Sequence, residues 1–302
     1  MTRYYSHGKL LISGEYLILE GAIGLAVPTV HGQDLVVEET NTGVLRWNSV
    51  DENEKTWFTA EFDLEDFELL KQSGDKHVGE QLQKILRTAR KMNSRFLITS
   101  EGCQVRTALE FSRNWGLGSS STLINNIAKW VDRNPFRLLF DSFGGSGYDI
   151  ACANSEKPLF YMLEGKQPKA YQVDFDPPFK NNLFFVYLNV KQSSKASIAQ
   201  FQEVQDFDDQ TLDHISAISK ELVRCANQED FNLLLEEHER IIGSVLDEEP
   251  IQKRYFKDFS GQVKSLGAWG GDFVLVSSET DPSDYFLKKG FKTVIPYSKL
   301  VL

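Results

Sequence analysis

The chain has little cysteine, histidine and methionine, with three, five and three residues among 302. Its cysteines, Cys103, Cys152 and Cys225, are widely spaced and odd in number, so they form neither a disulfide framework nor a Cys-x-x-Cys metal clip. We expect reduced, buried thiols. The histidines lack His-Glu-x-x-His spacing, which argues against a protein-built zinc site. His238 falls on an apolar helix pattern and is expected to be structural.

Long apolar runs and an excess of basic residues are also missing. No run approaches the ~18 apolar residues that a membrane-spanning helix needs, and the amino terminus lacks the apolar core of a signal peptide. The 33 basic and 43 acidic residues give a net charge of −10, which argues against nonspecific nucleic-acid binding. We therefore expect a cytoplasmic protein without a membrane or nucleic-acid partner. To hold an anion, this acidic protein would need a local basic site.

The length and composition are those of an ordinary globular protein of more than one domain, with 41% hydrophobic and 25% charged residues. Segment 174–182 contains two prolines and two asparagines, which end regular structure on either side. We expect an amino-terminal domain over residues 1–175 and a carboxy-terminal domain over residues 183–302.

Hydrophobic periodicity predicts a mixed α+β chain. Before residue 175, strands are expected at 9–12, 16–19, 24–26, 34–38, 96–100, 104–111, 158–163 and 170–175, and helices at 78–92 and 123–131. After residue 183, strands are expected at 183–190, 273–277 and 292–296, and helices at 194–205, 212–226, 231–246 and 283–288. This second order suggests helices that cover one face of an antiparallel sheet.

Two glycines and three hydroxyls stand directly before a helical pattern in segment 114–122, which reads Asn-Trp-Gly-Leu-Gly-Ser-Ser-Ser-Thr. Gly116 and Gly118 allow positive φ and a close approach of an anion to the backbone. The serines, Ser119 to Ser121, can cap the helix, whose dipole adds roughly half a positive charge at this end. The segment predicts a phosphate site, although an ordinary serine-capped helix after a glycine turn has the same pattern.

Three further turns are punctuated by glycine: Gly-Lys-Leu-Leu-Ile-Ser-Gly-Glu-Tyr at 8–16, Gly-Gly-Ser-Gly-Tyr-Asp-Ile-Ala at 144–151, and Gly-Ala-Trp-Gly-Gly-Asp at 267–272. Each contains a charged residue. The turn before Asp149 can present its carboxylate at the floor of a cavity. Capping of the next helix is the alternative use of that aspartate.

Taken in this order, the four turns resemble the signature motifs of the GHMP small-molecule kinases, over residues 7–272. The run 147–151 also resembles a bacterial subgroup named after its letters, Gly-Tyr-Asp-Ile-Ala. The resemblance implies a two-domain α+β fold, with an amino-terminal half like ribosomal S5 domain 2 and a ferredoxin-like carboxy-terminal half. It implies ATP-dependent transfer of the γ-phosphoryl group to a hydroxyl or phosphate of a small acid, with Mg²⁺.

The resemblance also implies residue roles. Asp149 is the expected catalytic aspartate, either as a general base or as a negative partner that orients the acceptor hydroxyl. Lys9 is expected to pair with it and to stabilise the transferring phosphoryl group. Ser120 is the expected Mg²⁺ ligand. The expected ATP-binding residues are Gly116, Leu117, Gly118, Ser119, Ser120 and Ser121.

Substrate binding is expected from several turns of the chain. The residues are Glu15, Ser146, Ser194, Lys195, Gly270, Gly271 and Asp272. Trp269 stands where GHMP kinases usually have a small residue, a departure that could narrow the acceptor pocket.

The acceptor is expected to be mevalonate or phosphomevalonate, in isoprenoid precursor synthesis. Segments 14–16 and 270–272 look more like phosphomevalonate kinases, whereas the chain length and the Ser-Ser-Lys run at 193–195 also suit mevalonate kinase. Two alternatives stay open: a kinase of another acceptor, such as homoserine or a sugar, and a noncatalytic GHMP-fold protein that binds a ligand or regulates. The expected partners are a small anionic substrate and, as one option, a second copy of the chain in a homodimer.

Overall fold

The computed structural model describes all residues except 166, 191–197, 199–200, 202, 204–206 and 270. The chain forms two compact units, each built from several segments. The first unit comprises Met1–Gly8, His31–Arg113 and Leu117–Asn154, and the second comprises Lys9–Val30, Asn114–Gly116 and Ser155–Leu302. The boundary expected at 174–182 lies within the second unit, between β8 (Gln167–Gln172) and β9 (Leu183–Tyr187).

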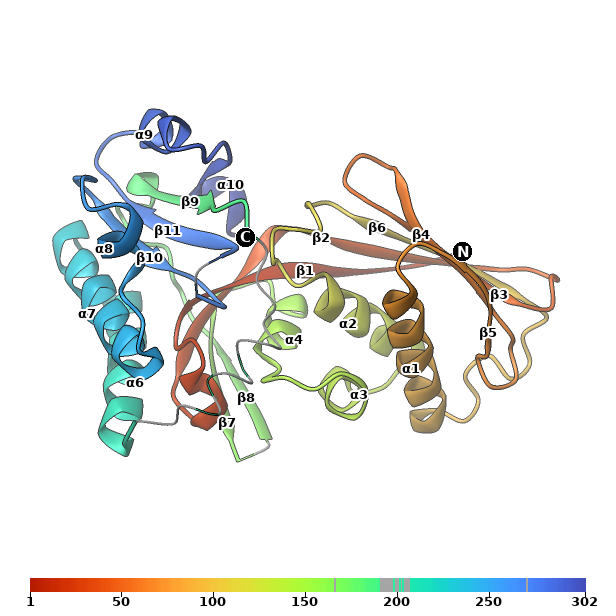
Figure 1. Ribbon diagram of the computed structural model, residues 1–302. Coiled ribbons are helices and arrows are strands. Elements are labelled where there is room, and N and C mark those ends of the chain that lie inside the picture. The colour runs from red at the N-terminus through yellow and green to blue at the C-terminus, as the bar shows by residue number, and fades with distance from the viewer. Residues whose placement is uncertain (166, 191–197, 199–200, 202, 204–206, 270) are drawn as a thin grey trace. The chain divides into compact units, whose positions relative to one another are not determined.

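The first unit is a sheet with helices on one face (Figure 1). Its strand order is β5-β4-β3-β6-β2, in which β3 is parallel to β6 and the other neighbours are antiparallel. Two long strands, β1 and β2, pair with each other and contribute residues to both units. The strands are β1 (Thr2–Ser13), β2 (Gly24–Glu39), β3 (Leu45–Val50), β4 (Thr56–Phe62), β5 (Leu69–Ser73) and β6 (Cys103–Leu109).

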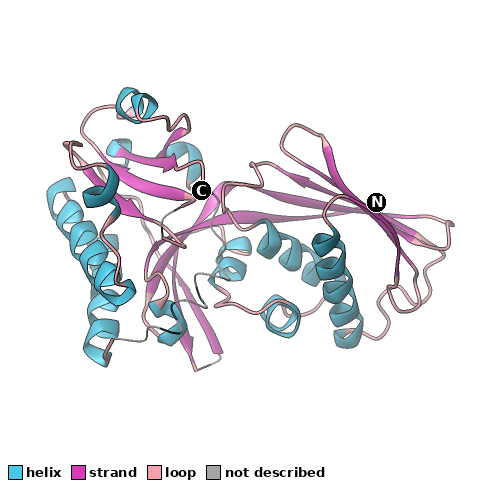
Figure 2. Cartoon of the chain, in the orientation of Figure 1, coloured by secondary structure: helices cyan, strands magenta, loops and turns pink. Residues whose placement is uncertain are grey.

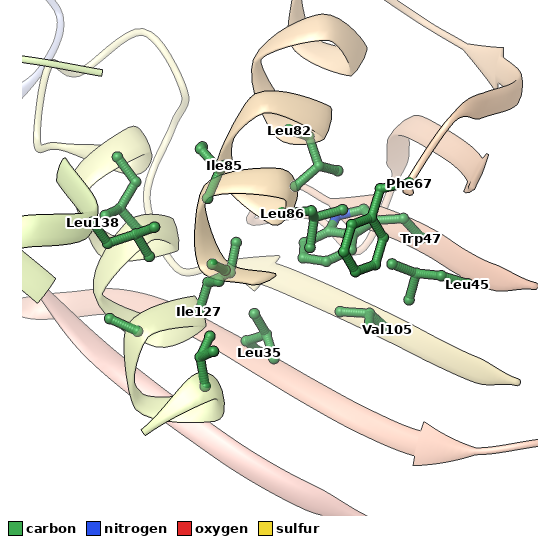
Figure 3. Close-up of a cluster of buried hydrophobic side chains, with 14 of the residues drawn as sticks. Leu35, Leu45, Trp47, Phe67, Leu82, Ile85, Leu86, Val105, Ile127 and Leu138 are labelled. Carbon is green, nitrogen blue, oxygen red and sulfur yellow. The ribbon is translucent and has the colours of Figure 1, made fainter. Parts of the chain in front are cut away.

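The helices of this unit bury apolar side chains in one core cluster with the sheet, in which α3 and α4 pack on the other helices. In α1 (Lys76–Met92) the buried stripe includes Leu82, Ile85 and Leu86, and the helix begins where the Asp75 side chain accepts a hydrogen bond from the His77 N–H. Figure 3 shows these side chains gathered above the strands that carry Trp47 and Val105. The remaining helices are α2 (Ser119–Val131), α3 (Pro135–Ser142) and α4 (Tyr148–Ala153).

The second unit contains a four-stranded antiparallel sheet of order β10-β11-β9-β12 and a hairpin, β7-β8, that pairs with the first residues of β2. The elements of this sheet follow the order β9-α6-α7-α8-β10-β11-α9-β12, a ferredoxin-like β-α-β-β-α-β pattern with additional helices in its first connection. Figure 2 shows its strands flanked by helices. The described elements of the second unit, besides the ends of β1 and β2, are η1 (Leu17–Glu20), β7 (Leu159–Glu164), β8, η2 (Lys180–Asn182), β9, α6 (Asp209–Arg224), α7 (Gln228–Leu246), α8 (Ile251–Tyr255), β10 (Gln262–Ser265), β11 (Phe273–Ser277), α9 (Ser283–Lys288), β12 (Val294–Pro296) and α10 (Tyr297–Leu300).

Helices pack on both faces of the four-stranded sheet. Phe184 and Val274 point to the face that is covered by Phe256 and Phe286, which follow or lie in α8 and α9. The next position along β9, Phe185, points to the other face and stacks on Tyr297 of α10, with 6.1 Å between ring centroids. The expectation of helices on one face is wrong, because Phe286 of α9 packs on the Phe184 face, whereas α7 contacts β10 beside Lys264, on the Phe185 face.

Most predicted elements are confirmed within a few residues, and two predicted strands are wrong. Residues 16–19 form the 3₁₀ helix η1 instead, because Gly14 and Tyr16 both have positive φ (91° and 62°) and turn the chain away from β1. Residues 96–100 form turns, in which Leu97 has φ 58°. The helix expected at 194–205 lies mostly outside the described residues.

Truncation of Leu86 tests the core of the first unit. Leu86 is fully buried under α1, so Leu86→Ala should lower the free energy of unfolding by about 3 kcal/mol through lost burial and a residual cavity. Leu70→Ala, at a side chain that is 54% exposed, should cost less than about 1 kcal/mol. Urea denaturation of both variants measures the difference, and equal losses would show that α1 does not seal this core.

Candidate active site

The serine loop leads into α2 through a glycine in the left-handed conformation. Gly118 is the N-cap with φ 89°, and the helix begins at Ser119 without a side-chain hydrogen bond from the cap. The expectation that the serines cap this helix is therefore wrong, since the cap position belongs to a residue with no side chain. The N–H groups of the first turn and the positive end of the helix dipole are the features that favour an anion.

The hydroxyls of this loop differ in where they lie. Thr122 is buried, and its Oγ1 donates a hydrogen bond of 2.6 Å to Gln33 Oε1 of β2. Ser120 is exposed, whereas Ser119 and Ser121 are half-buried. Ser120 is thus the hydroxyl of the first turn that solvent reaches best, and its oxygen is of the type that Mg²⁺ accepts as a ligand.

Asp149 lies in the first turn of α4, after three glycines with positive φ. Gly144, Gly145 and Gly147 have φ of 86°, 103° and 90°, and Gly147 is the N-cap. Asp149 is half-buried and does not occupy the cap position, so the structure does not use it as an N-cap residue. Helix α4 packs against α2, which places both glycine-led helices in one layer of the first unit.

Lys9 and Ser146 have more enclosed surroundings than a surface position offers. Lys9 lies on β1 between buried Gly8 and Leu10 and is itself half-buried. Ser146 is 6% exposed in the glycine turn before α4. Both side chains are therefore less exposed than those of an ordinary lysine at a strand end or serine in a loop.

The last glycine turn is tied to the Trp115–Gly116 segment within the second unit. Asp272 has φ 51°, and its backbone N–H and C=O bond to Val190 O and the Leu188 N–H at 2.6 and 2.8 Å. A Cβ atom at Gly116, which has φ 65°, would lie 2.3 Å from the Asp272 carboxylate, so a side chain there would be strained and would displace that carboxylate. The beginning of the serine loop and the end of the last turn therefore lie close together at these two residues.

Glu15 is 1% exposed and has a charged partner that sequence reasoning missed. Its Oε1 accepts a hydrogen bond of 2.6 Å from Nζ of Lys264, which is fully buried on β10. Next to this pair, His238 Nε2 of α7 accepts a 3.0 Å hydrogen bond from the Gly14 N–H. The structural role expected of His238 is confirmed, because it is fully buried and fixes the backbone beside Glu15.

Trp269 points into the second unit. Its side chain is 6% exposed, and a Cβ atom at Gly243 of α7 would lie 3.5 Å from its Cη2. The indole ring therefore packs against the glycine of α7, which accounts for its bulk in a turn where a small residue was expected. Gly271 of the same turn is buried. The substrate-binding candidates Ser194, Lys195 and Gly270 lie outside the described residues.

Acidic side chains suited to a metal gather in the described residues at Asp63, Asp66 and Glu68. The carboxylate of Asp63 accepts hydrogen bonds from the N–H groups of Glu65, Asp66 and Glu68, so its oxygens already stabilise a turn of the backbone.

No helix in the described part of the chain is long and apolar enough to cross a membrane.

The two units together have the fold of the GHMP kinases, as the glycine motifs predicted. The phosphomevalonate kinase of Streptococcus pneumoniae, solved with phosphomevalonate and AMPPNP, is similar with a TM-score of 0.69 at 17% identity, over 100% of this chain and 98% of that one. The Methanococcus jannaschii mevalonate kinase has a TM-score of 0.67 at 14% identity, over 95% and 94%. The Lactococcus lactis galactokinase, solved with galactose, has a TM-score of 0.66 at 12% identity, over 95% and 87%. No family model and no curated protein sequence matches the chain.

Glu239 gives the stability of the second unit a pH dependence. Burial raises the pKa of this carboxyl group, and nearby Glu15 adds to the rise while Lys264 opposes it, so that the pKa changes from 4.5 to about 7. Between these values the folded chain holds a proton that the unfolded chain has released. This proton therefore stabilises the folded chain fully below pH 4.5, and the stabilisation is lost as the pH rises to about 7.

Glu239→Gln removes this titration while keeping the shape of the side chain. Relative to the variant, the wild type should lose roughly 2 to 4 kcal/mol of unfolding free energy between pH 4.5 and 7.5, and nothing more above that. Urea denaturation at a series of pH values gives the two curves. Parallel curves over this range would mean that Glu239 titrates normally in the folded protein.

Proposed function

We propose that the chain is an ATP-dependent small-molecule kinase, which transfers the γ-phosphoryl group to a hydroxyl or phosphate of a small anionic substrate. The observation that carries the proposal is the start of α2. There, a left-handed Gly118 leaves the first turn of the helix without a side-chain cap, directly beside three serines. Backbone N–H groups presented in this way suit phosphate oxygens. The GHMP fold is consistent with this use.

The residues of the first unit supply three of the roles that phosphoryl transfer needs. N–H groups of residues 118–121 would donate to the phosphates of ATP. The exposed hydroxyl of Ser120 would hold Mg²⁺, which neutralises phosphate charge when it is bound. Asp149 would accept the proton of the acceptor hydroxyl or orient that hydroxyl, and both roles use its half-buried carboxylate at the start of α4.

The residues of the second unit supply charge and shape. The ammonium of Lys9 would stabilise the negative oxygens of the transferring phosphoryl group. Gly271 and Asp272 are proposed to bind the acceptor, together with Ser146 of the first unit and Ser194, Lys195 and Gly270. Glu15 is proposed to contribute to substrate binding by holding its own turn in place, because its buried carboxylate is paired with Lys264.

We favour mevalonate or phosphomevalonate as acceptor, in isoprenoid precursor synthesis. The three similar structures have TM-scores of 0.66 to 0.69, which do not separate an acid acceptor from a sugar. The choice therefore rests on the residues, since the Gly-Gly-Asp end of the last turn resembles that of phosphomevalonate kinases. A noncatalytic binding protein is the alternative, but it would have no chemical need for Lys9, the serine loop and Asp149 together.

ADP release from ATP and Mg²⁺, measured with mevalonate, phosphomevalonate, homoserine and galactose in parallel, tests the function. The proposal expects acceptor-dependent ADP release with one acid. ADP release with galactose alone would keep the kinase and change its acceptor. Binding of ATP without ADP release in any of these mixtures would favour the noncatalytic alternative.

Gly118→Val should weaken ATP binding by about tenfold or more. A β-branched side chain resists positive φ and stands where an anion would approach the helix. Gly43→Val is the matched control: Gly43 also has positive φ (72°), but a Cβ atom there would meet no other atom within 4 Å. Calorimetric titration with ATP should separate the two variants. Equal affinities for ATP would leave the start of α2 without a role in phosphate binding.

Asp149→Asn should reduce turnover by roughly 10² to 10⁴ and change ATP affinity little, since the amide keeps the size but neither accepts the proton nor carries the charge. Asp284→Asn is the control, because Asp284 also lies in the first turn of a helix, α9, and is exposed. Steady-state kinetics with the identified acceptor measure both. Near-normal turnover of folded Asp149→Asn would remove this aspartate from the chemistry.

A further inference from the structure

Four titratable side chains lie together in the interior of the second unit, which we call the buried cluster: Glu15, His238, Glu239 and Lys264. Each is at most 2% exposed. They come from the turn after β1, from two neighbouring positions on α7 and from β10. We propose that Lys264 is a positioning residue, whose buried ammonium holds turn 13–16 and turn 265–269 in the arrangement that the kinase site requires. This inference rests on the proposed function.

Lys264 occupies a strand position that normally carries an apolar side chain. It pairs with Leu275 of β11, which in turn pairs with Phe185 of β9, so the lysine shares a sheet face with two large apolar residues. Its Nζ donates to Glu15 Oε1 at 2.6 Å and to the backbone O of Ser265 at 2.7 Å. One ammonium therefore binds a group from each of the two turns.

Helix α7 holds the same two turns with consecutive residues. His238 Nε2 accepts a hydrogen bond from the Gly14 N–H at 3.0 Å. Glu239 Oε1 accepts one from the Ser265 N–H at 2.9 Å. Burial, followed by the charge of Lys264, lowers the pKa of His238 well below its ordinary value, so the ring stays neutral and keeps the lone pair that Gly14 needs.

Turn 13–16 has a further anchor on α6. Ser13 Oγ lies 2.7 Å from Ser219 Oγ and accepts a hydrogen bond from the Leu25 N–H at 3.1 Å. Gly14, at φ 91°, leaves no room for a side chain, since a Cβ atom there would lie 2.7 Å from the Cα of Gly24. The turn that ends the Lys9 strand is thus fixed on three sides, and Lys264 is the link that joins it to turn 265–269.

The buried cluster is a poor device for stability alone. His238 Nδ1 is buried without a hydrogen-bond partner among the described residues, and Glu15 Oε2 accepts no hydrogen bond there, although it lies 3.2 Å from His238 Nε2. Buried ion pairs often contribute no more to stability than apolar residues of the same size, whereas removal of one partner leaves an uncompensated charge. What the pair does supply is directional fixing of two turns, one after the strand of Lys9 and one before Gly271 and Asp272.

Lys264→Met tests the proposal by removing the ammonium at nearly constant volume. Amide hydrogen exchange, with Gly14 and Ser265 as probes, reports the two turns without any reference to activity. We expect exchange at both amides to accelerate at least tenfold in the variant. We also expect kcat to fall at least tenfold, because misplaced groups slow the chemical step, while the KM for ATP changes less than about threefold. Lys289→Met, which removes the exposed 2.9 Å pair with Asp258 in the same unit, should alter neither readout.

The double variant Glu15→Gln/Lys264→Met supplies the second measurement. Because it leaves no unpaired charge, it should recover folding while still lacking the ammonium, so exchange at Gly14 and Ser265 should stay fast and kcat should stay low. A double variant with normal exchange and normal kcat would overturn the proposal. Loss of folding in both variants would also overturn it, and so would a Lys264→Met enzyme that differs from wild type only in thermal stability. If the wild type shows no kinase activity, the proposed function fails by itself, and the positioning role fails with it only if exchange is also unchanged.

Discussion

The ion pair between Lys264 and Glu15 is the interaction on which the arrangement of the second unit's glycine turns depends. Two charged groups separated by 249 positions in the chain meet at 2.6 Å, away from solvent. A carboxylate buried in this way needs a cation nearby, and the cation needs acceptors, so the backbone around both is held in place. His238 and Glu239 then fix the adjacent N–H groups from α7.

The first unit reaches its own arrangement by a different physical device. Gly118 and Gly147 occupy N-caps with positive φ, and neither provides a side-chain cap for the helix that follows. The N–H groups at the start of α2 are thereby presented by backbone geometry, and Asp149 enters α4 in its first turn. Charge in the second unit is positioned by buried partners, whereas in the first unit it is positioned by left-handed glycines.

Local patterns in the sequence predicted what they physically determine. The apolar spacing of α1 and α7, the alternation in β6 and the glycine turns are all visible within a few residues. Strands β3, β4 and β5 were all missed: most side chains of β5 are exposed, so it has no apolar face to detect, but β3 and β4 do alternate and were overlooked. The pairing of Lys264 with Glu15 was missed because nothing local distinguishes a buried lysine on a short strand from an exposed one, and the contact exists only after the chain has folded.

Hydrogen exchange with and without AMPPNP and Mg²⁺ tests the central claim, that the glycine-led start of α2 binds nucleotide phosphate. The account predicts slower exchange of the amides of residues 118–121 on addition of the nucleotide, since N–H groups that bind phosphate oxygens are protected from solvent. Protection elsewhere in the chain, with the amides of 118–121 unchanged at saturating nucleotide, would contradict it.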